Sequence, residues 1–492
     1  MKSRKYDNAI LDNGHGRPVT RREFLGRGLI SGLGLVMAPG LLSFLARTPD
    51  AYAQAAECGV ATGVAGKVPF LAFDLAGGAS IAGSNVMVGG QGGQLDFLPA
   101  AGYQKLGLPA DMLPNLPGQL NSELGLAFHA DSALLRGILS KTTAATRANT
   151  NGAIFAARSE NDTGNNPHNP MYGIAKAGAV GDLVTLIGTR TSESGGKSRA
   201  PASMVDLSVR PTKVDRANDA MGLVDTGKLT SLMSGADAAR VMQAIEQLSA
   251  AKINKLTEQA VVKQLLTCSY SQTSDMVARF GDPSLLDPTT DTRLQALFPN
   301  GQITSNVDFR KSAAVLKLVV NGFAGAGTIE LAGYDYHNST RATGEQKDFV
   351  AGQAIGAALE YAAQLNRPLM IYVFSDGAVD SNGKLDNSAN GRGKGIWKGD
   401  NSSTASTFIL VYNPAGRPVL TSASNQQIGY FKANGSLELT ATPISNNVDQ
   451  LAAAVVLNYM ALNNEVGRFT SVLPNNGLGS ALDKLVAFQP IG

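Results

Sequence analysis

Residues 68–78 read VPFLAFDLAGG, a short apolar run that carries one carboxylate and ends in two glycines. A continuous apolar run of this length, bounded by turn residues, is typical of a buried strand. The two glycines predict a tight turn directly behind it. We therefore expect a buried strand that delivers Asp74 to a Gly-rich turn.

Further along the chain, apolar runs alternate with segments of helical spacing. The runs predict strands over 183–188, 327–331, 368–374 and 408–412. The helical spacing predicts helices over 131–139, 236–266, 309–323, 349–365 and 449–460. Residues 79–125 and 144–170 are rich in polar and turn residues and are expected to be loops. Apolar strands that alternate with helices indicate a three-layer, doubly wound α/β fold with a mostly parallel sheet, here with a helical insertion at about 230–300.

The first 55 residues have the features of an export signal. Basic residues and the pair Arg21-Arg22 precede an apolar segment over 29–46, and Ala51-Tyr52-Ala53 follows as a small-residue cleavage site. This order predicts a cleaved twin-arginine signal over 1–55 and a single α/β domain over 56–492. The predicted partner is the twin-arginine export machinery, and the predicted location is the periplasm or the exterior. The alternative, a retained membrane span, is weakened by the glycines and the proline in a barely sufficient apolar run.

The charge balance changes when this signal is set aside. The whole chain has 42 Lys and Arg against 39 Asp and Glu; without residues 1–55 the numbers are 34 and 35. No basic stripe is left for phosphate contacts, so no nucleic-acid partner is expected. Two cysteines, Cys58 and Cys268, could form a bridge in an oxidising compartment, although the sequence leaves the pairing open.

Three predicted strands end in potential metal ligands. Asp74 lies near the end of the first, Asp335 and His337 follow the strand at 327–331, and Asp376 follows the strand at 368–374. Ligands of parallel sheets bind beyond the carboxyl ends of the strands. Carboxylates with one imidazole suit a divalent metal: Zn²⁺, Mn²⁺, Mg²⁺ or Ca²⁺. The alternative is that each Asp is an ordinary cap or turn residue.

Five short motifs carry a family resemblance. They are Phe73–Ala79, with a Gly-Gly-Ala turn; Leu126–His129, before a helix; Pro167–Tyr172, in a segment that ends at Gly178; Gly333–His337; and Phe374–Gly377. In order and spacing, over most of residues 68–460, they resemble the twin-arginine-exported family called domain of unknown function 1501. That family is similar to distant members of the alkaline phosphatase and sulfatase superfamily.

The resemblance implies an alkaline-phosphatase-like fold and a metal-dependent hydrolase that acts on a phosphate or sulfate ester, with a small ester or glycan-type substrate. Serines in the turn after the first strand would supply a hydroxyl nucleophile or a phosphate contact. By their position in this turn, the nucleophile candidates are Ser80 and Ser84. The implied metal ligands are Asp74, His168, Asp335, His337, Asp376 and Asp400.

The chain also departs from the family pattern. Ser80 stands where the family turn continues with Asp, and Asn401 follows Asp400 where the family has a histidine. Behind the signal only three histidines occur, His129, His168 and His337. These departures favour the rival hypothesis, a non-catalytic envelope or surface protein that keeps the fold without the chemistry. A redox enzyme finds no support, because neither a dinucleotide-binding turn nor a Cys-x-x-Cys motif occurs.

Several single residues keep two interpretations. His129 borders an apolar stretch and is expected to be a core or loop histidine, while His168 is either a ligand or a loop residue. Ser80 and Ser84 are equally interpreted as ordinary turn serines. Trp397 is expected in a flexible loop, where it belongs either to a lid or sugar-stacking surface or to simple packing.

Overall fold

The structure is a computed structural model that describes residues 67–161, 167–189, 199–224, 240, 282–338, 340–480 and 482–491. Apart from Val224, Arg240 and Asp282, these residues belong to one compact unit formed by 61–223 and 283–492. The predicted signal, both cysteines and most of the predicted insertion lie outside the described residues, so those expectations stay predictions.

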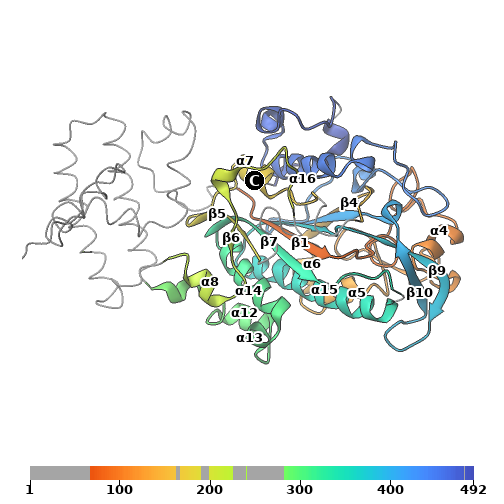
Figure 1. Ribbon diagram of the computed structural model, residues 1–492, viewed down its shortest axis with the longest axis horizontal. Coiled ribbons are helices and arrows are strands. Elements are labelled where there is room, and N and C mark those ends of the chain that lie inside the picture. Colours follow the sequence, from red (N-terminus) through yellow and green to blue (C-terminus); the bar gives the residue numbers. More distant parts are fainter. Residues whose placement is uncertain are drawn as a thin grey trace, which may run out of the picture. The chain divides into compact units, whose positions relative to one another are not determined.

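A central sheet of eight strands organises the described part of the chain (Figure 1). Its order is β12 (Gln427–Ile428), β4 (Thr150–Phe155), β11 (Thr407–Tyr412), β8 (Leu369–Phe374), β1 (Phe70–Ala76), β7 (Ala324–Ala332), β5 (Val184–Gly188) and β6 (Thr212–Lys213). Strand β11 runs antiparallel to β8 and β4, and the other neighbours are parallel. The predicted α/β class with a mostly parallel sheet is confirmed.

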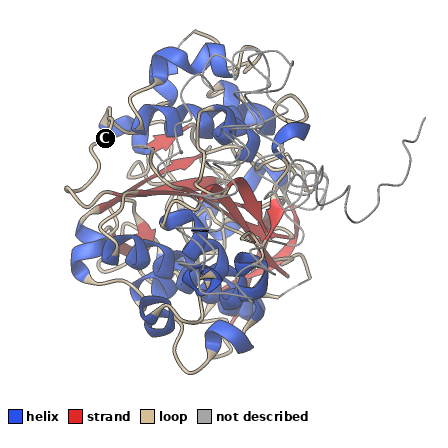
Figure 2. Ribbon diagram, turned by 90° about the vertical axis from the view of Figure 1, so that its left-hand side faces the viewer, coloured by secondary structure: helices blue, strands red, loops and turns tan. Residues whose placement is uncertain are grey.

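Helices cover both faces of this sheet (Figure 2). On one face, α7 (Met171–Lys176) and α16 (Val448–Leu462) pack against alternate residues of the strands, among them Ala326 and Phe374. The opposite face meets α14 (Val307–Val320), as the contact of Gly327 with Val315 and Val319 indicates. The arrangement is compatible with a three-layer α/β fold.

The two long helices α14 and α15 (Arg341–Gln364) pack together, and α15 also packs closely on α5 (Ala133–Leu139). Glycines of α15 allow this approach, because a Cβ at Gly352 would lie 2.0 Å from the Leu134 carbonyl oxygen. Helices α15 and α5 therefore pack with their backbones close together on this side of the sheet.

The remaining elements are short. The helices are α4 (Ala100–Lys105), α6 (Ala144–Ala148), α8 (Ala217–Met221), α12 (Thr292–Leu297), α13 (Gln302–Ser305) and α17 (Phe469–Val472). The further strands are β2 (Leu120–Asn121) with β3 (Phe128–His129), and the hairpin of β9 (Val379–Asp386) with β10 (Lys394–Asp400).

Among the sequence-based expectations that differ from the structure, three concern elements close to the candidate site. Strand β4 lies inside 144–170, which was expected to be loop; its polar residues hid it, and Asn151 is satisfied by donating to the Pro418 carbonyl at 2.8 Å. Helix α15 begins at Arg341, ahead of the predicted start at 349, because its polar first turns are buried by contacts that the pattern does not reveal. The segment around Trp397 is strand β10 and not a flexible loop.

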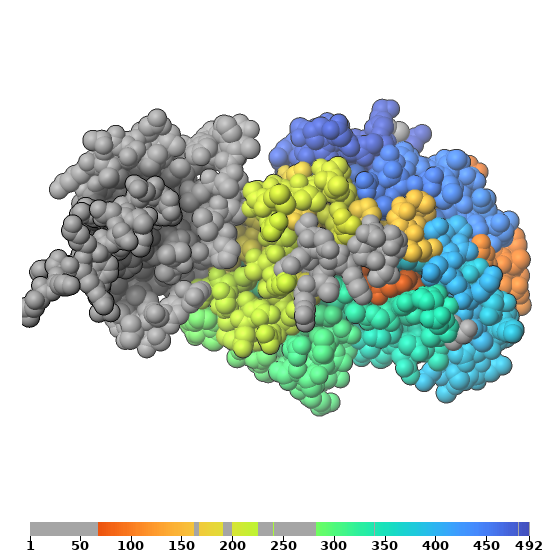
Figure 3. Space-filling model, in the orientation of Figure 1, coloured from red at the N-terminus to blue at the C-terminus, as the bar shows by residue number. Residues whose placement is uncertain are grey.

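Figure 3 shows one face of the molecule in the orientation of Figure 1. On this face the segment near residue 200, yellow-green in the picture, lies between the dark-blue C-terminal part and the green residues that follow 283. Within the ranges that the structure describes, no helix has both the length and the apolar character needed to cross a membrane.

Candidate functional site

Segments from distant parts of the chain meet at the carboxyl edge of the sheet, behind β1. The Gly77 amide donates to Asp376 Oδ1 at 2.6 Å, directly after β8. Gly77 has φ of +131°, and a Cβ there would lie 2.8 Å from the backbone nitrogen of Asp335. Only glycine permits this backbone approach. The turn therefore brings Asp376 and Asp335 to either side of one residue, as the parallel strand ends predicted.

Ser375 fixes the end of β8 to the same turn. Its hydroxyl donates to the Leu75 carbonyl at 2.7 Å and accepts from the Ala79 amide at 2.8 Å. Both groups are buried, so these hydrogen bonds replace contacts with water. Asp376, next in the chain, is only 2% exposed. The Ser-Asp-Gly motif thus has a structural part in joining β1 to β8.

His337 lies between two carboxylates at this edge. Its Nδ1 contacts Asp335 Oδ1 and is 3.7 Å from Asp400 Oδ1, which the last residue of β10 supplies. The three side chains are 36%, 49% and 51% exposed, so the group is open to solvent. We call Gly77, Asp335, His337, Asp376 and Asp400 the rim. A carboxylate at Nδ1 orients an imidazole and leaves the other ring nitrogen for a proton or a ligand.

The donor types of the rim suit a divalent metal, but the side chains are not arranged around an ion. Both carboxylates approach Nδ1 of His337 itself, so that nitrogen faces carboxylate oxygens directly. Across the described stretches, no three His, Cys, Asp or Glu side chains are grouped so that they could share a metal ion. The described geometry does not fit the predicted ion.

Two other predicted ligands lie beneath the rim, among residues on the α7 and α16 face. Asp74 is fully buried within β1, where its Cα partners are Glu330 of β7 and Phe374 of β8. His168 stacks on the Phe374 ring, with centroids 5.9 Å apart and planes at 13°. In the part of the chain that the structure describes, neither ring nitrogen of His168 has a hydrogen-bond partner.

Burial, with the Arg158 charge as a second cause, lowers the pKa of His168 to about 3. The ring is therefore neutral at neutral pH and packs as an aromatic group. The structure thus divides the predicted ligands into two sets. Asp335, His337 and Asp400 meet at the surface with Asp376 close by through Gly77, while Asp74 and His168 share the buried environment of Phe374.

The predicted hydroxyl candidates are both buried. Ser80 and Ser84 are each 1% exposed. The Ser80 carbonyl accepts from Asn85 Nδ2 at 3.0 Å, and the Ser84 amide donates to the Ala82 carbonyl at 3.1 Å. In this structure neither hydroxyl is presented to a substrate, and their catalytic role stays a prediction.

Two residues with open interpretations are packing residues. His129 is fully buried on β3; its Nε2 is 3.0 Å from the Met112 carbonyl, and burial lowers its pKa to about 4. Trp397 is buried, and the Arg341 guanidinium lies 4.5 Å above its ring. His129 is a core histidine, as expected, and Trp397 offers no surface to a sugar in this structure.

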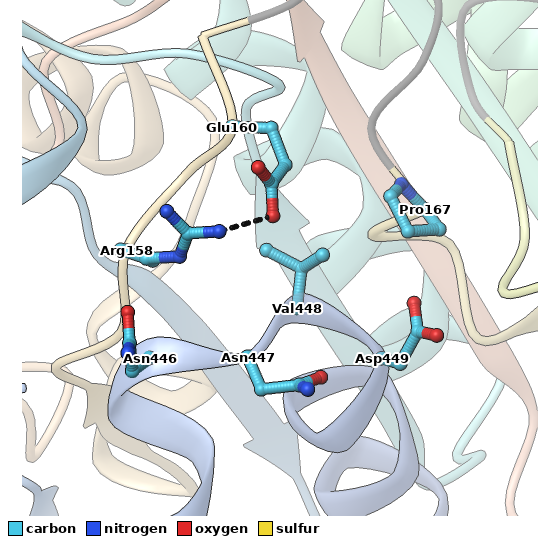
Figure 4. Close-up of a pocket in the computed structure, with 7 residues that line it drawn as sticks. All are labelled: Arg158, Glu160, Pro167, Asn446, Asn447, Val448 and Asp449. Carbon is cyan, nitrogen blue, oxygen red and sulfur yellow. Dashed lines mark hydrogen bonds and ion pairs between the residues drawn. The ribbon is translucent and has the colours of Figure 1, made fainter. Parts of the chain in front are cut away.

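A pocket of about 430 Å³ opens at the same edge of the sheet (Figure 4). Its lining residues follow β4 or begin α16: Arg158, Glu160, Pro167, Asn446, Asn447, Val448 and Asp449. Arg158 donates to Glu160 at 2.8 Å, and the ion pair is half-buried. Burial raises the pKa of Asp449, with the Glu160 charge as a second cause.

The pocket lies close to the segment that follows β8 in the chain. Asn161, close in sequence to Glu160, accepts from the Ala378 amide at 2.9 Å. Sequence reasoning missed Arg158 because it follows a strand that the sequence did not predict. It also missed Asp348 of α15, a buried residue behind the rim, because its polar surroundings in the sequence resemble a solvent-facing first turn.

Comparison with protein-family models and with curated proteins finds no match for this chain. The interpretation of the site therefore depends on its own residues.

Proposed function

We propose that this chain is an exported, hydrolase-like protein of the alkaline phosphatase type that cleaves a phosphate or sulfate ester at the rim. The proposal includes the resemblance to the exported family named above. One observation carries it: an imidazole, His337, is held by Asp335 and faces Asp400 at the solvent-open carboxyl edge of a mostly parallel sheet. In such sheets this edge is where ligands bind.

The chemistry follows from the His337–Asp335 pair. A carboxylate at Nδ1 fixes the tautomer of the ring, so the opposite nitrogen can take a proton from an attacking water. The electron pair of that water oxygen then forms the new bond to phosphorus or sulfur, and the ester oxygen leaves with the bonding pair. Arg158, in the pocket at the same edge of the sheet, would supply a cation to the anionic group in place of its present partner Glu160.

No step of this proposal uses a metal ion, because the described side chains do not form a ligand set for one. The divalent ion predicted from the sequence remains a separate, measurable proposal. Elemental analysis of the purified native protein tests it. A stoichiometric divalent metal that stabilises the fold would support that prediction, and protein without metal would contradict it.

A second candidate is a non-catalytic envelope or surface binding protein. The burial of Ser80 and Ser84 favours it, since no described hydroxyl of that turn is placed at the rim as a nucleophile. In this case the rim and the Arg158 pocket bind an ester or a glycan without cleaving it. The two candidates differ in turnover and not in binding.

The test is hydrolysis of p-nitrophenyl phosphate and p-nitrophenyl sulfate by the wild type, Asp335→Asn and Asp483→Asn. Asp483 is an exposed aspartate remote from the rim in sequence and serves as the control. We expect kcat to fall by at least on the order of 100-fold in Asp335→Asn and to stay unchanged in Asp483→Asn. Equal activity of all three proteins, or no turnover by the wild type, would contradict the hydrolase proposal.

A further inference from the structure

Two tyrosines connect residues 334–337, the segment that carries Asp335 and His337, to helix α15 by hydrogen bonds. Tyr334 and Tyr336 flank Asp335, and both are fully buried. The Tyr334 hydroxyl donates to the Lys347 carbonyl at 2.8 Å, and the Tyr336 hydroxyl donates to Asp348 Oδ1 at 2.7 Å. The exposed Asp335 therefore projects from a backbone that is anchored on both sides.

Asp348 also holds the loop behind β1. Its second oxygen, Oδ2, accepts from Asn85 Nδ2 at 2.7 Å. The same Asn85 nitrogen donates to the Ser80 carbonyl at 3.0 Å, and Asn85 Oδ1 accepts from Ser132 at 2.8 Å. One carboxylate thus joins the segment that carries His337 to the turn that carries Gly77 and Ser80.

We propose that Asp348 is the positioning residue of the rim, and that its two accepted hydrogen bonds hold His337 and the turn behind β1 in their mutual geometry. The inference rests on the proposed function for the catalytic role of His337. The position of His337 does not depend on that function. Asp348 itself does not reach the rim surface, because it is buried on the inner side of Tyr336.

The chemistry of the carboxylate explains why this position needs Asp. Both partners are donors, so an ionised carboxylate satisfies both, whereas a carboxylic acid or an amide would turn a donor toward one of them. Burial raises the pKa of Asp348 to about 7, and the hydrogen bonds from Tyr336 and Asn85 oppose this rise. The other titratable or charged groups that act on it are Tyr334, Glu345 and Arg341. The support is therefore weakened where the carboxylate becomes protonated, on the acid side of neutrality.

The histidine content of the chain makes the test direct. The full chain has only four histidines, so a spectrum of protein labelled with ¹³C at histidine Cε1 contains few peaks, and His337→Gln identifies the one that belongs to His337. The variants are Asp348→Asn, which turns an amide N–H toward a donor, and Tyr336→Phe, which deletes a single hydroxyl. The matched control is Glu360→Gln on the same helix, a buried carboxylate that accepts from Thr143 and Thr146 instead.

We expect Asp348→Asn and Tyr336→Phe to shift or broaden the His337 peak at pH 8, while Glu360→Gln lowers thermal stability and leaves that peak in place. If the wild type hydrolyses the esters, kcat should also fall on the order of 100-fold in Asp348→Asn, with KM little changed. An unshifted His337 peak in both Asp348→Asn and Tyr336→Phe would overturn the inference. A shifted peak in a protein without turnover would support it and contradict only the proposed function.

Discussion

Two histidines near the same edge of the sheet have opposite surroundings. His337 is open to solvent and contacts two carboxylates, whereas His168 is fully buried, stacks on Phe374 and leaves both ring nitrogens unbonded in the described part of the structure. Sequence reasoning assigned both as metal ligands. The difference shows that residue type and position in a loop do not distinguish a solvent-exposed histidine that could act in catalysis from a histidine that is packed in the core.

The electrostatic consequence differs as well. For His168, burial disfavours the protonated ring, so its pKa falls to about 3. His337 lies at the surface instead, with the Asp335 and Asp400 carboxylates near its Nδ1. His168 therefore affects the stability of the fold under acid, whereas the role that we propose for His337 is proton transfer at the surface.

The largest expected effect that follows from this comparison is loss of stability in acid. An unfolded histidine has a pKa near 6.5, so the unfolded chain binds more protons than folded His168 between about pH 6.5 and pH 3. The contribution of His168 is fully present above pH 6.5 and is lost as the pH falls toward 3, on the order of 4 kcal/mol in total. Urea unfolding followed by fluorescence of the single tryptophan, at a series of pH values, measures it.

The control for this pH dependence of the unfolding free energy is His168→Phe. This variant keeps an aromatic ring against Phe374 and removes the titrating group. We expect its free energy of unfolding at pH 7 to stay close to that of the wild type and its decline in acid to become shallower. The same steep decline in both proteins would show that other groups cause it.

The next effect concerns the turn that builds the rim. Gly77→Ala forces a Cβ to within 2.8 Å of the Asp335 nitrogen at a positive φ, and we expect a loss on the order of 3 kcal/mol in unfolding free energy. Gly416→Ala is the matched control, because Gly416 has φ of +139° but no atom near its Cβ position. The control should lose less. Equal losses in both variants would mean that the close approach to Asp335 does not matter.

The smallest expected effect on stability is that of His337→Gln. Its ring is half-exposed and its contacts with the two carboxylates lie at the surface, so the free energy of unfolding should change by no more than about 0.5 kcal/mol. Thermal or urea unfolding checks this. A loss of several kcal/mol would make His337 a structural residue and erase the contrast with His168.

The sequence was informative about the frame of the site. The apolar runs located β1, β7 and β8, and because parallel strands end at one edge, the convergence of Asp335 and Asp376 near Gly77 was predictable. Asp74 was placed near the turn, but the register set by Glu330 and Phe374 buries it inside the sheet.

The surroundings of single side chains were not predictable in this way. Whether His168 is buried depends on Phe374, far away in sequence, and the hydrogen bond between Asp348 and Asn85 joins residues that are 263 positions apart in the chain. Periodicity reports which face of an element is apolar, and carries no signal for such distant polar contacts. Strand β4 was missed for a related reason, because the polar residues around it are satisfied by partners outside the segment.

We propose that His337 takes part in catalysis at this edge of the sheet and that His168 is a structural residue. The most direct measurement compares the rates of p-nitrophenyl phosphate and sulfate hydrolysis in the wild type, His337→Gln and His168→Phe under identical conditions. We expect His337→Gln to lose on the order of 100-fold or more in kcat and His168→Phe to keep the rate of the wild type. Full activity in His337→Gln, together with loss of activity in a folded His168→Phe, would contradict it.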